Sequence, residues 1–92
     1  MDKHNWAFLT NHGHVLIYLV KNPKATTREI AIEAGVTERA IQKVIHDLEA
    51  EGYIVRHKEG RSNNYTLHPE LPMRHRLEHD HAVRDLIKAL GD

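Results

Sequence analysis

The stretch REIAIEAGVTERAIQKVIHDLEAEGYIVR, residues 28–56, holds two apolar helical patterns that are almost in contact. Only Gly35, Val36 and Thr37 separate them. Glycine readily takes the left-handed conformation that closes a helix, and threonine is a preferred residue at a helix N-terminus. We therefore expect one helix to end near Ala34 and the next to begin at once. So short a joint fixes the direction of the later helix, which suggests that this helix presents its exposed face to a binding partner.

Both helices carry further end signals. Thr26 and Glu29 have the spacing of a capping box, and Val36 and Ile41 have that of a hydrophobic staple. The later helix has one apolar stripe, formed by Ile41, Val44, Ile45 and Leu48. Its opposite face carries Arg39, Gln42, Lys43 and His46.

The flanking segments predict the remaining elements. A core helix is expected over 11–21, after Thr10 and before Pro23. After Gly52 the spacing of apolar residues changes from that of a helix to that of a strand. A β-hairpin is therefore expected, with strands at 53–57 and 65–68 around a turn at Gly60. Its predicted tip holds Lys58, Arg61, Ser62, Asn63 and Asn64. A last helix is expected over roughly 78–90, with Val83, Leu86, Ile87 and Leu90 on one side.

Composition limits the class of protein. Ninety-two residues, 40% of them hydrophobic, suit one small domain with a modest core. The absence of cysteine excludes disulfides and zinc-thiolate sites. A polar start and short apolar runs predict a soluble, cytoplasmic protein without signal peptide or membrane span. No nucleophile elbow, phosphate loop or paired catalytic carboxylates appear, so neither an enzyme nor a cofactor is expected.

Helix, helix, tight turn, helix and hairpin: this order resembles the winged helix-turn-helix family, in particular the MarR-like and ArsR-like prokaryotic transcription regulators. The resemblance rests on Ala31, Gly35, Ile41 and Val44, followed by LEAEGYIVR at 48–56. It implies an α+β, mostly helical fold in which a three-helix core and a β-hairpin wing precede an additional C-terminal helix. The winged domain would span 1–68, and 69–92 would be a connector and a C-terminal dimerisation helix.

The function implied by the resemblance is sequence-specific binding to double-stranded DNA, with the third helix in the major groove and the wing on the backbone or minor groove. Carried over to this chain, the contacts from the helix-turn-helix would be Thr26, Thr27, Arg28, Thr37, Arg39, Gln42, Lys43 and His46. The contacts from the wing would be Lys58, Arg61 and Asn63.

The charge balance opposes this interpretation. Thirteen Lys and Arg match thirteen Asp and Glu, so the chain is formally neutral, whereas affinity for DNA comes largely from neutralising phosphates. Glu38 and Glu59 also lie near the two expected contact surfaces. Nonspecific affinity is therefore expected to be low, and the distribution of charge over the faces becomes decisive.

Three other interpretations are open. The polar face of the third helix could be an ordinary solvated face, or the winged domain could dock on another protein; docking would call for an exposed apolar patch on that helix, which the sequence lacks. The nine histidines allow a metal-responsive regulator, although no metal site is expected overall. The candidate ligands for it are His75, His79 and His81.

A homodimer is also expected, because a small domain whose last helix is apolar on one side would otherwise expose that side. Terminal helices form the dimer in the related regulators. The candidate interface residues are Trp6, Phe8, Val83, Leu86, Ile87 and Leu90, with packing inside one chain as the alternative. No effector, operator or direction of regulation follows from the sequence.

Overall fold

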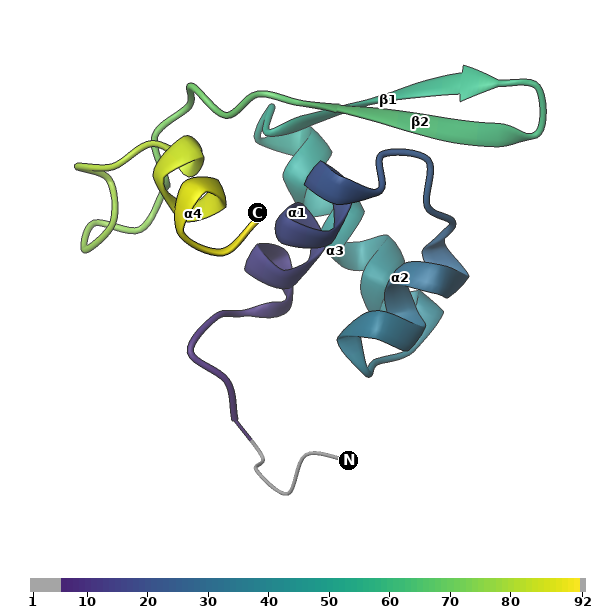
Figure 1. The fold of residues 1–92 in the computed structure, drawn as a ribbon, viewed down its shortest axis with the longest axis horizontal. Helices are drawn as coiled ribbons and strands as arrows, with labels where there is room; N and C mark the ends of the chain where they lie inside the picture. Colours follow the sequence, from purple (N-terminus) through teal and green to yellow (C-terminus); the bar gives the residue numbers. More distant parts are fainter. Residues whose placement is uncertain (1–5, 92) are drawn as a thin grey trace.

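The computed structural model describes residues 6–91, which form four helices and one hairpin (Figure 1). In chain order the elements are α1 (Asn11–Lys21), α2 (Thr27–Ala34), α3 (Glu38–Ala50), β1 (Ile54–Glu59), β2 (Ser62–Leu67) and α4 (Val83–Leu90). The predicted fold class is confirmed, since three helices precede an antiparallel two-stranded wing and a further helix. None of the helices within this described part is long and apolar enough to cross a membrane.

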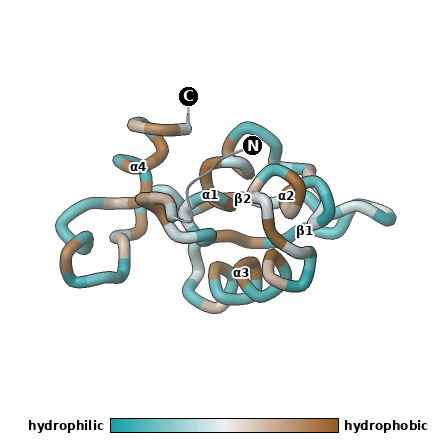
Figure 2. The backbone as a smooth tube through the Cα atoms, turned by 90° about the horizontal axis from the view of Figure 1, so that it is seen from below, coloured by the Kyte–Doolittle hydropathy of each residue, from teal (hydrophilic) through white to brown (hydrophobic). Residues whose placement is uncertain are grey.

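The core lies where α1, α2 and α3 meet beneath the root of the hairpin. Its largest fully buried side chains are Val15, Leu19, Ile30, Ile41 and Ile54. The apolar stripe predicted for α3 is buried completely, and Figure 2 shows hydrophobic residues on the inner side of this helix and hydrophilic residues on its outer side. The helical period read from the sequence therefore decides which face of α3 stays exposed.

The joint between α2 and α3 has the predicted form. Gly35 adopts a left-handed conformation with φ of 75°, and the amides of Gly35 and Val36 both donate to the carbonyl oxygen of Ala31. Thr37 then caps α3, because its hydroxyl accepts a hydrogen bond from the Ala40 amide at 3.1 Å. Two helix ends are satisfied within three residues, which fixes the direction in which α3 leaves α2.

We expect Gly35→Ala to lower the free energy of unfolding by about 1 kcal/mol. A β-carbon at this position would have no atom within 4 Å, so the cost comes from the positive φ alone and not from a clash. Urea unfolding measures the difference. Gly35→Asn is the matched control and should cost less, because asparagine tolerates the left-handed conformation better than alanine. An alanine variant as stable as the parent would contradict the assigned role.

The wing is longer and its turn tighter than expected. Pairing runs from Ile54 opposite Leu67 to Glu59 opposite Ser62, so only Gly60 and Arg61 form the turn. The predicted turn at Gly60 is confirmed but its predicted extent was wrong, because four of the polar residues placed at the tip, Lys58, Ser62, Asn63 and Asn64, lie in the strands. Gly60 has φ of 62°, a positive value of the kind that a two-residue hairpin turn needs. The strands extend into polar residues because backbone pairing, more than apolar alternation, holds an exposed ribbon together.

The last helix begins at Val83, and the predicted start near residue 78 was wrong. Residues 75–81 form successive turns instead. Backbone hydrogen bonds from the Met73 amide to His81 and from the Val83 amide to Leu71 hold the two ends of this excursion together. These bonds engage the backbone before α4, so the helix is confined to the residues after Ala82.

The connector and α4 pack against the winged core. Val83 is 3% exposed and belongs to the same buried cluster as the residues of α1 and α3, with Leu71 and Ile87 beside it. The hydroxyl of Tyr53 donates to the carbonyl oxygen of Pro72 at 2.7 Å, and burial raises the pKa of this phenol. The C-terminal segment is therefore part of the folded body of this chain.

A side-chain hydrogen bond between His12 and Asp47 ties α1 to α3. Nε2 of His12 lies 2.8 Å from Oδ2 of Asp47, and Nζ of Lys43 lies 3.0 Å from Oδ1 of the same carboxylate. The hydrogen bond with His12, and after it the one from Lys43, holds the pKa of Asp47 below its ordinary value. A carboxylate with a lowered pKa stabilises the fold while it stays ionised.

The pH dependence of stability should reveal this contact. Because the pKa of Asp47 is lower in the folded chain than its ordinary 3.8, its stabilisation is complete above that value and disappears as the pH falls through the folded value. Asp47→Asn should thus be less stable than the parent at pH 7, and the gap should close in acid. Chemical unfolding at several pH values measures it. Glu33→Gln, at an exposed acid without a side-chain partner in the described chain, should show no such gap.

Candidate nucleic-acid interface

The exposed face of α3 is the centre of the candidate interface. Arg39, Gln42, Lys43 and His46 all lie on it, as the sequence predicts. Arg39, Gln42 and His46 make no side-chain hydrogen bond or ion pair with any residue that the structure describes. Lys43 differs, because its ammonium group is held by Asp47 one turn away. Three of the four side chains are therefore free to bind an external partner.

The residues at the helix starts have structural partners of their own. The Thr26 hydroxyl accepts from the Glu29 amide, and the Glu29 carboxylate accepts from the Thr26 amide, which completes the predicted capping box. The Thr27 hydroxyl donates to Glu38 at 3.4 Å. Arg28 is exposed beside them and has no such partner within residues 6–91. Sequence reasoning assigned both threonines to DNA; in the structure Thr26 also caps α2, as predicted, and Thr27 also binds Glu38.

The wing extends beyond the helical body, as Figure 1 shows. Lys58 and Arg61 are exposed, and neither forms an ion pair with the described residues. Asn63 lies opposite Lys58 in the hairpin and is half-exposed. The predicted wing residues thus lie along one end of a protruding ribbon, with Arg61 in its turn.

A hollow of about 240 Å³ joins these surfaces. It brings together the start of α2, one flank of α3 and the root of β1. Its lining contains three of the predicted contact residues and one arginine that sequence reasoning did not assign, Arg56; the full lining is Thr27, Gln42, Ile45, His46, Glu49 and Arg56. Strand alternation could have identified Arg56, because it lies two residues before Lys58 and shares its face of the ribbon.

Each carboxylate near this surface has an internal partner. Glu38 accepts from Thr27, and Oε1 of Glu59 lies 3.7 Å from Nζ of Lys24. Asp47 is held by two basic side chains, and Oε1 of Glu49 accepts from Nη2 of Arg56 at 3.2 Å. In the described part of the chain Arg28, Arg39, Lys58 and Arg61 have no ion-pair partner. The start of α2, the exposed face of α3 and the wing of this formally neutral chain therefore each carry at least one basic side chain without an ion-pair partner.

The histidines of the C-terminal segment do not converge. Residues 6–91 contain no group of three or more His, Asp or Glu side chains arranged to hold a metal ion. His75 accepts a hydrogen bond from the Leu77 amide, whereas Nδ1 of His79 and of His81 lie 3.0 Å from Asp80 and Asp85. His75 and His79 are four residues apart and would share a helical face only if α4 began before them, but α4 begins at Val83.

The predicted dimerisation residues fall into two groups. Trp6 and Phe8 are 67% and 93% exposed and pack edge to face with ring centroids 5.2 Å apart, and Leu90 is half exposed. Leu86 and Ile87 are half-buried, while Val83 is buried in the core of its own chain. The exposed members of this predicted set therefore lie in the segment before α1 and at the end of α4.

Comparison with solved structures agrees with this architecture. A variant of ZitR from Lactococcus lactis superposes with a TM-score of 0.52 at 17% identity, over 73% of this chain and 48% of that one. A variant of MepR from a multidrug-resistant S. aureus clinical isolate superposes with a TM-score of 0.60 at 19% identity, over 100% of this chain and 65% of that one. Both are winged-helix regulators of the MarR family, so the winged-helix resemblance is confirmed.

The chain spans about half to two-thirds of the length of these two structures, and likeness at such low identity supports the fold alone. No curated protein matches the sequence. A family model does match: the family described as sugar-specific transcriptional regulator TrmB covers residues 11–73, from the first residue of α1 to just beyond the wing. Members of this family are DNA-binding regulators and not enzymes. The free side chains on α3 and the wing lie within the matched range, and the chain belongs to the TrmB family of transcriptional regulators.

Proposed function

We propose that this chain binds duplex DNA in a sequence-specific manner, with α3 in the major groove and the wing on the backbone or in the minor groove. The observation that carries the proposal is the row of free polar side chains on α3 beside a protruding basic wing. An α-helix fits the width of the major groove, where base edges are distinguishable. The proposal includes the cytoplasmic location expected from the sequence, because the DNA bound by a prokaryotic regulator lies in the cytoplasm.

The side chains of α3 take different roles by their chemistry. Arg39 is suited to a bidentate contact with guanine, and Gln42 is suited to adenine. His46 lies one turn beyond Gln42 on the same face and extends the contact row. Lys43 binds a phosphate, and its pairing with Asp47 orients the ammonium group along the flank of α3.

The surrounding residues bind the backbone. Arg28, Thr27 and the capping threonines Thr26 and Thr37 lie at helix starts, where free amides and the helix dipole favour an anion. Lys58 and Asn63 take phosphates along the wing, and Arg61 at its turn reaches toward the minor groove. These contacts position the protein, whereas those of α3 select the sequence.

The structure offers little support for protein docking through α3. The large hydrophobic side chains that are exposed within residues 6–91 are Trp6, Phe8, Ile32, Val55, Leu77 and Leu90. None of them lies on α3, and a docking helix would need an apolar patch. The polar face of α3 matches a base-reading surface better.

The proposal includes a homodimer held by the terminal segments. Trp6, Phe8 and Leu90 leave apolar surface in contact with water, which association with a second copy would bury. Figure 1 shows α4 and the tip of the wing on opposite sides of the molecule, so such an interface leaves the wing free. Each copy of α3 would then bind one DNA half-site, and the two half-sites would lie about one turn of the DNA helix, roughly 34 Å, apart.

Selection of binding sites from random duplex DNA, run at low and moderate salt, tests the function directly. An enriched palindrome is the expected result, since a two-fold dimer reads a symmetric site. Absence of enrichment at every salt concentration would contradict the proposal. The description of the family as sugar-specific makes sugars the first class of effector to add to such an assay.

Two substitutions should separate base reading from backbone binding. Gln42→Ala should change the preferred base at one position, at a cost of about 1–3 kcal/mol on the selected site. Arg61→Ala should weaken binding to most duplexes by a similar factor, because a wing contact adds charge and groove-width readout. Binding constants for the selected site and its single-base variants measure both effects.

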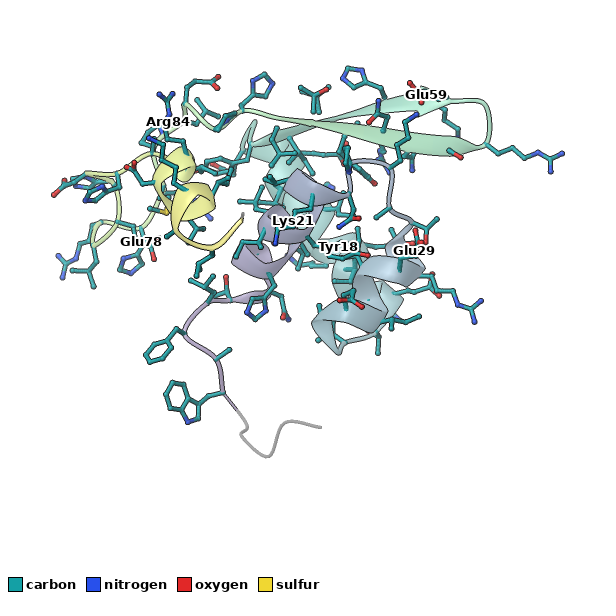
Figure 3. The ribbon with its side chains drawn as sticks, in the orientation of Figure 1. Tyr18, Lys21, Glu29, Glu59, Glu78 and Arg84 are labelled. Carbon is teal, nitrogen blue, oxygen red and sulfur yellow. The ribbon has the colours of Figure 1, made fainter. Side chains whose placement is uncertain are left out.

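Arg84→Ala is the control for Arg61, because Figure 3 places Arg84 on α4, away from the wing that carries the labelled Glu59. It removes the same charge from the opposite side of the molecule. If Gln42→Ala and Arg61→Ala bind every sequence as well as the parent does, the assigned DNA surface is wrong.

Dimer formation is tested by substitution at the exposed apolar residues. Deleting α4 would uncover the core around Val83, so Trp6→Ser, Phe8→Ser and Leu90→Ser are combined instead. The triple variant should be monomeric by sedimentation, keep the circular dichroism of the parent, and bind the selected palindrome much more weakly. The reason is that the second half-site no longer binds at high effective concentration.

Ile32→Ser is the matched control, because Ile32 is 69% exposed on α2 and lies outside the proposed interface. It should leave both the oligomeric state and the affinity unchanged. A triple variant that remains dimeric would place the interface elsewhere, and a monomer with unchanged affinity would exclude a role for the dimer in binding.

A further inference from the structure

Arg56 lies at the root of the wing and faces the recognition helix α3. Side chains alternate between the two faces of a strand, so Arg56 shares a face with Ile54 and Lys58. Ile54 on that face is 1% exposed, and Tyr65, the partner of Arg56 across the ribbon, is 3% exposed. The inner face of β1 thus runs from the core through Arg56 to Lys58, a proposed phosphate contact.

The surroundings of Arg56 are already part of the proposed DNA surface. It lines the hollow of about 240 Å³ together with Thr27 from the start of α2, and with Gln42 and His46 from the exposed face of α3. Duplex DNA lying against α3 would therefore also cover this hollow. The flank of a helix in the major groove faces the sugar-phosphate backbone at the groove edge, not the bases.

The guanidinium group of Arg56 retains most of its binding capacity. Nη2 donates to Oε1 of Glu49 at 3.2 Å, and the guanidinium group makes no other side-chain hydrogen bond or ion pair with the described residues. A guanidinium group has five N–H donors in a rigid fork, so the others remain free. The Arg56 side chain is 47% exposed and that of Glu49 is 26% exposed. The more accessible member of the pair is therefore the cation.

We propose that Arg56 is a further DNA-binding residue, which contacts a backbone phosphate lying over the hollow between α2, α3 and β1. The inference rests on the proposed function, because it assigns one more contact to the same surface. Glu49 holds the arginine by one donor and at the same time brings a negative charge close to the phosphate. The two members of this ion pair therefore act on DNA affinity in opposite directions.

Arg56→Gln and Glu49→Gln, made separately in the whole chain, test the proposal. Each substitution breaks the same ion pair, so any loss of stability should be similar, which thermal unfolding checks. Dissociation constants are then measured for the selected site and for unrelated duplexes over a range of salt. Arg74→Gln and Glu51→Gln are the matched controls, because Nε of Arg74 lies 3.9 Å from Oε1 of Glu51 and neither residue lines the hollow.

Arg56→Gln should weaken binding to every duplex by about tenfold, as expected for the loss of a hydrogen bond between charged groups. The slope of log affinity against log salt should decrease by about 1, and base preference should stay as in the parent. Glu49→Gln should strengthen binding to every duplex, because the arginine keeps its place and the carboxylate that repels phosphate is gone. The two control substitutions should have much smaller effects.

Three results would overturn the assignment. If both Arg56→Gln and Glu49→Gln weaken binding, the ion pair only holds the wing against α3. If Arg56→Gln changes the preferred base at one position, the arginine reads a base and not a phosphate. If Arg56→Gln binds like the parent, it makes no contact. A parent protein that binds no duplex at all is a different outcome, which rejects the proposed function itself.

Discussion

The left-handed turn at Gly35 is the constraint on which the rest of the structure depends. It lets α2 end at Ala34 and α3 begin at Glu38, and both following amides bind one carbonyl group, that of Ala31. Ala31 itself is buried and small, so the two helices approach closely. With the entry angle of α3 set in this way, its apolar stripe meets α1 and α2, and the polar row is left on the outside.

The second organising feature is electrostatic. A neutral chain is a poor ligand for a polyanion only if its charges are evenly distributed. In this fold the carboxylates beside the candidate interface bind partners from other elements: Thr27 for Glu38, Lys24 for Glu59 and Arg56 for Glu49. Lys24 and Arg56 offset the charge of Glu59 and Glu49, whereas Arg28, Arg39, Lys58 and Arg61 have no ion-pair partner among the described residues. Net charge alone could not have revealed this, because it does not record which charges meet.

Much of the fold was predictable from local patterns. The three helices of the core, the capping box at Thr26 and the cap at Thr37 all follow from contacts within four residues along the chain. The exposed row on α3 follows from the same period. The start of α4 was predicted wrongly, because hydrogen bonds to the connector at Pro69 and Leu71 compete with helix formation before Val83. The strands of the hairpin were predicted too short, because their polar ends lack the apolar alternation that identifies a strand in a sequence.

The sequence by itself determined the elements and the face that each one exposes, because helical and strand periods are local properties of the chain. Only the tertiary structure decided which partners meet across elements. His12 binds Asp47 from another helix, Arg56 turns toward Glu49, and Val83 enters the core of its own chain. Such contacts depend on the angles at which the elements cross, and these angles arise from the packing of the whole core.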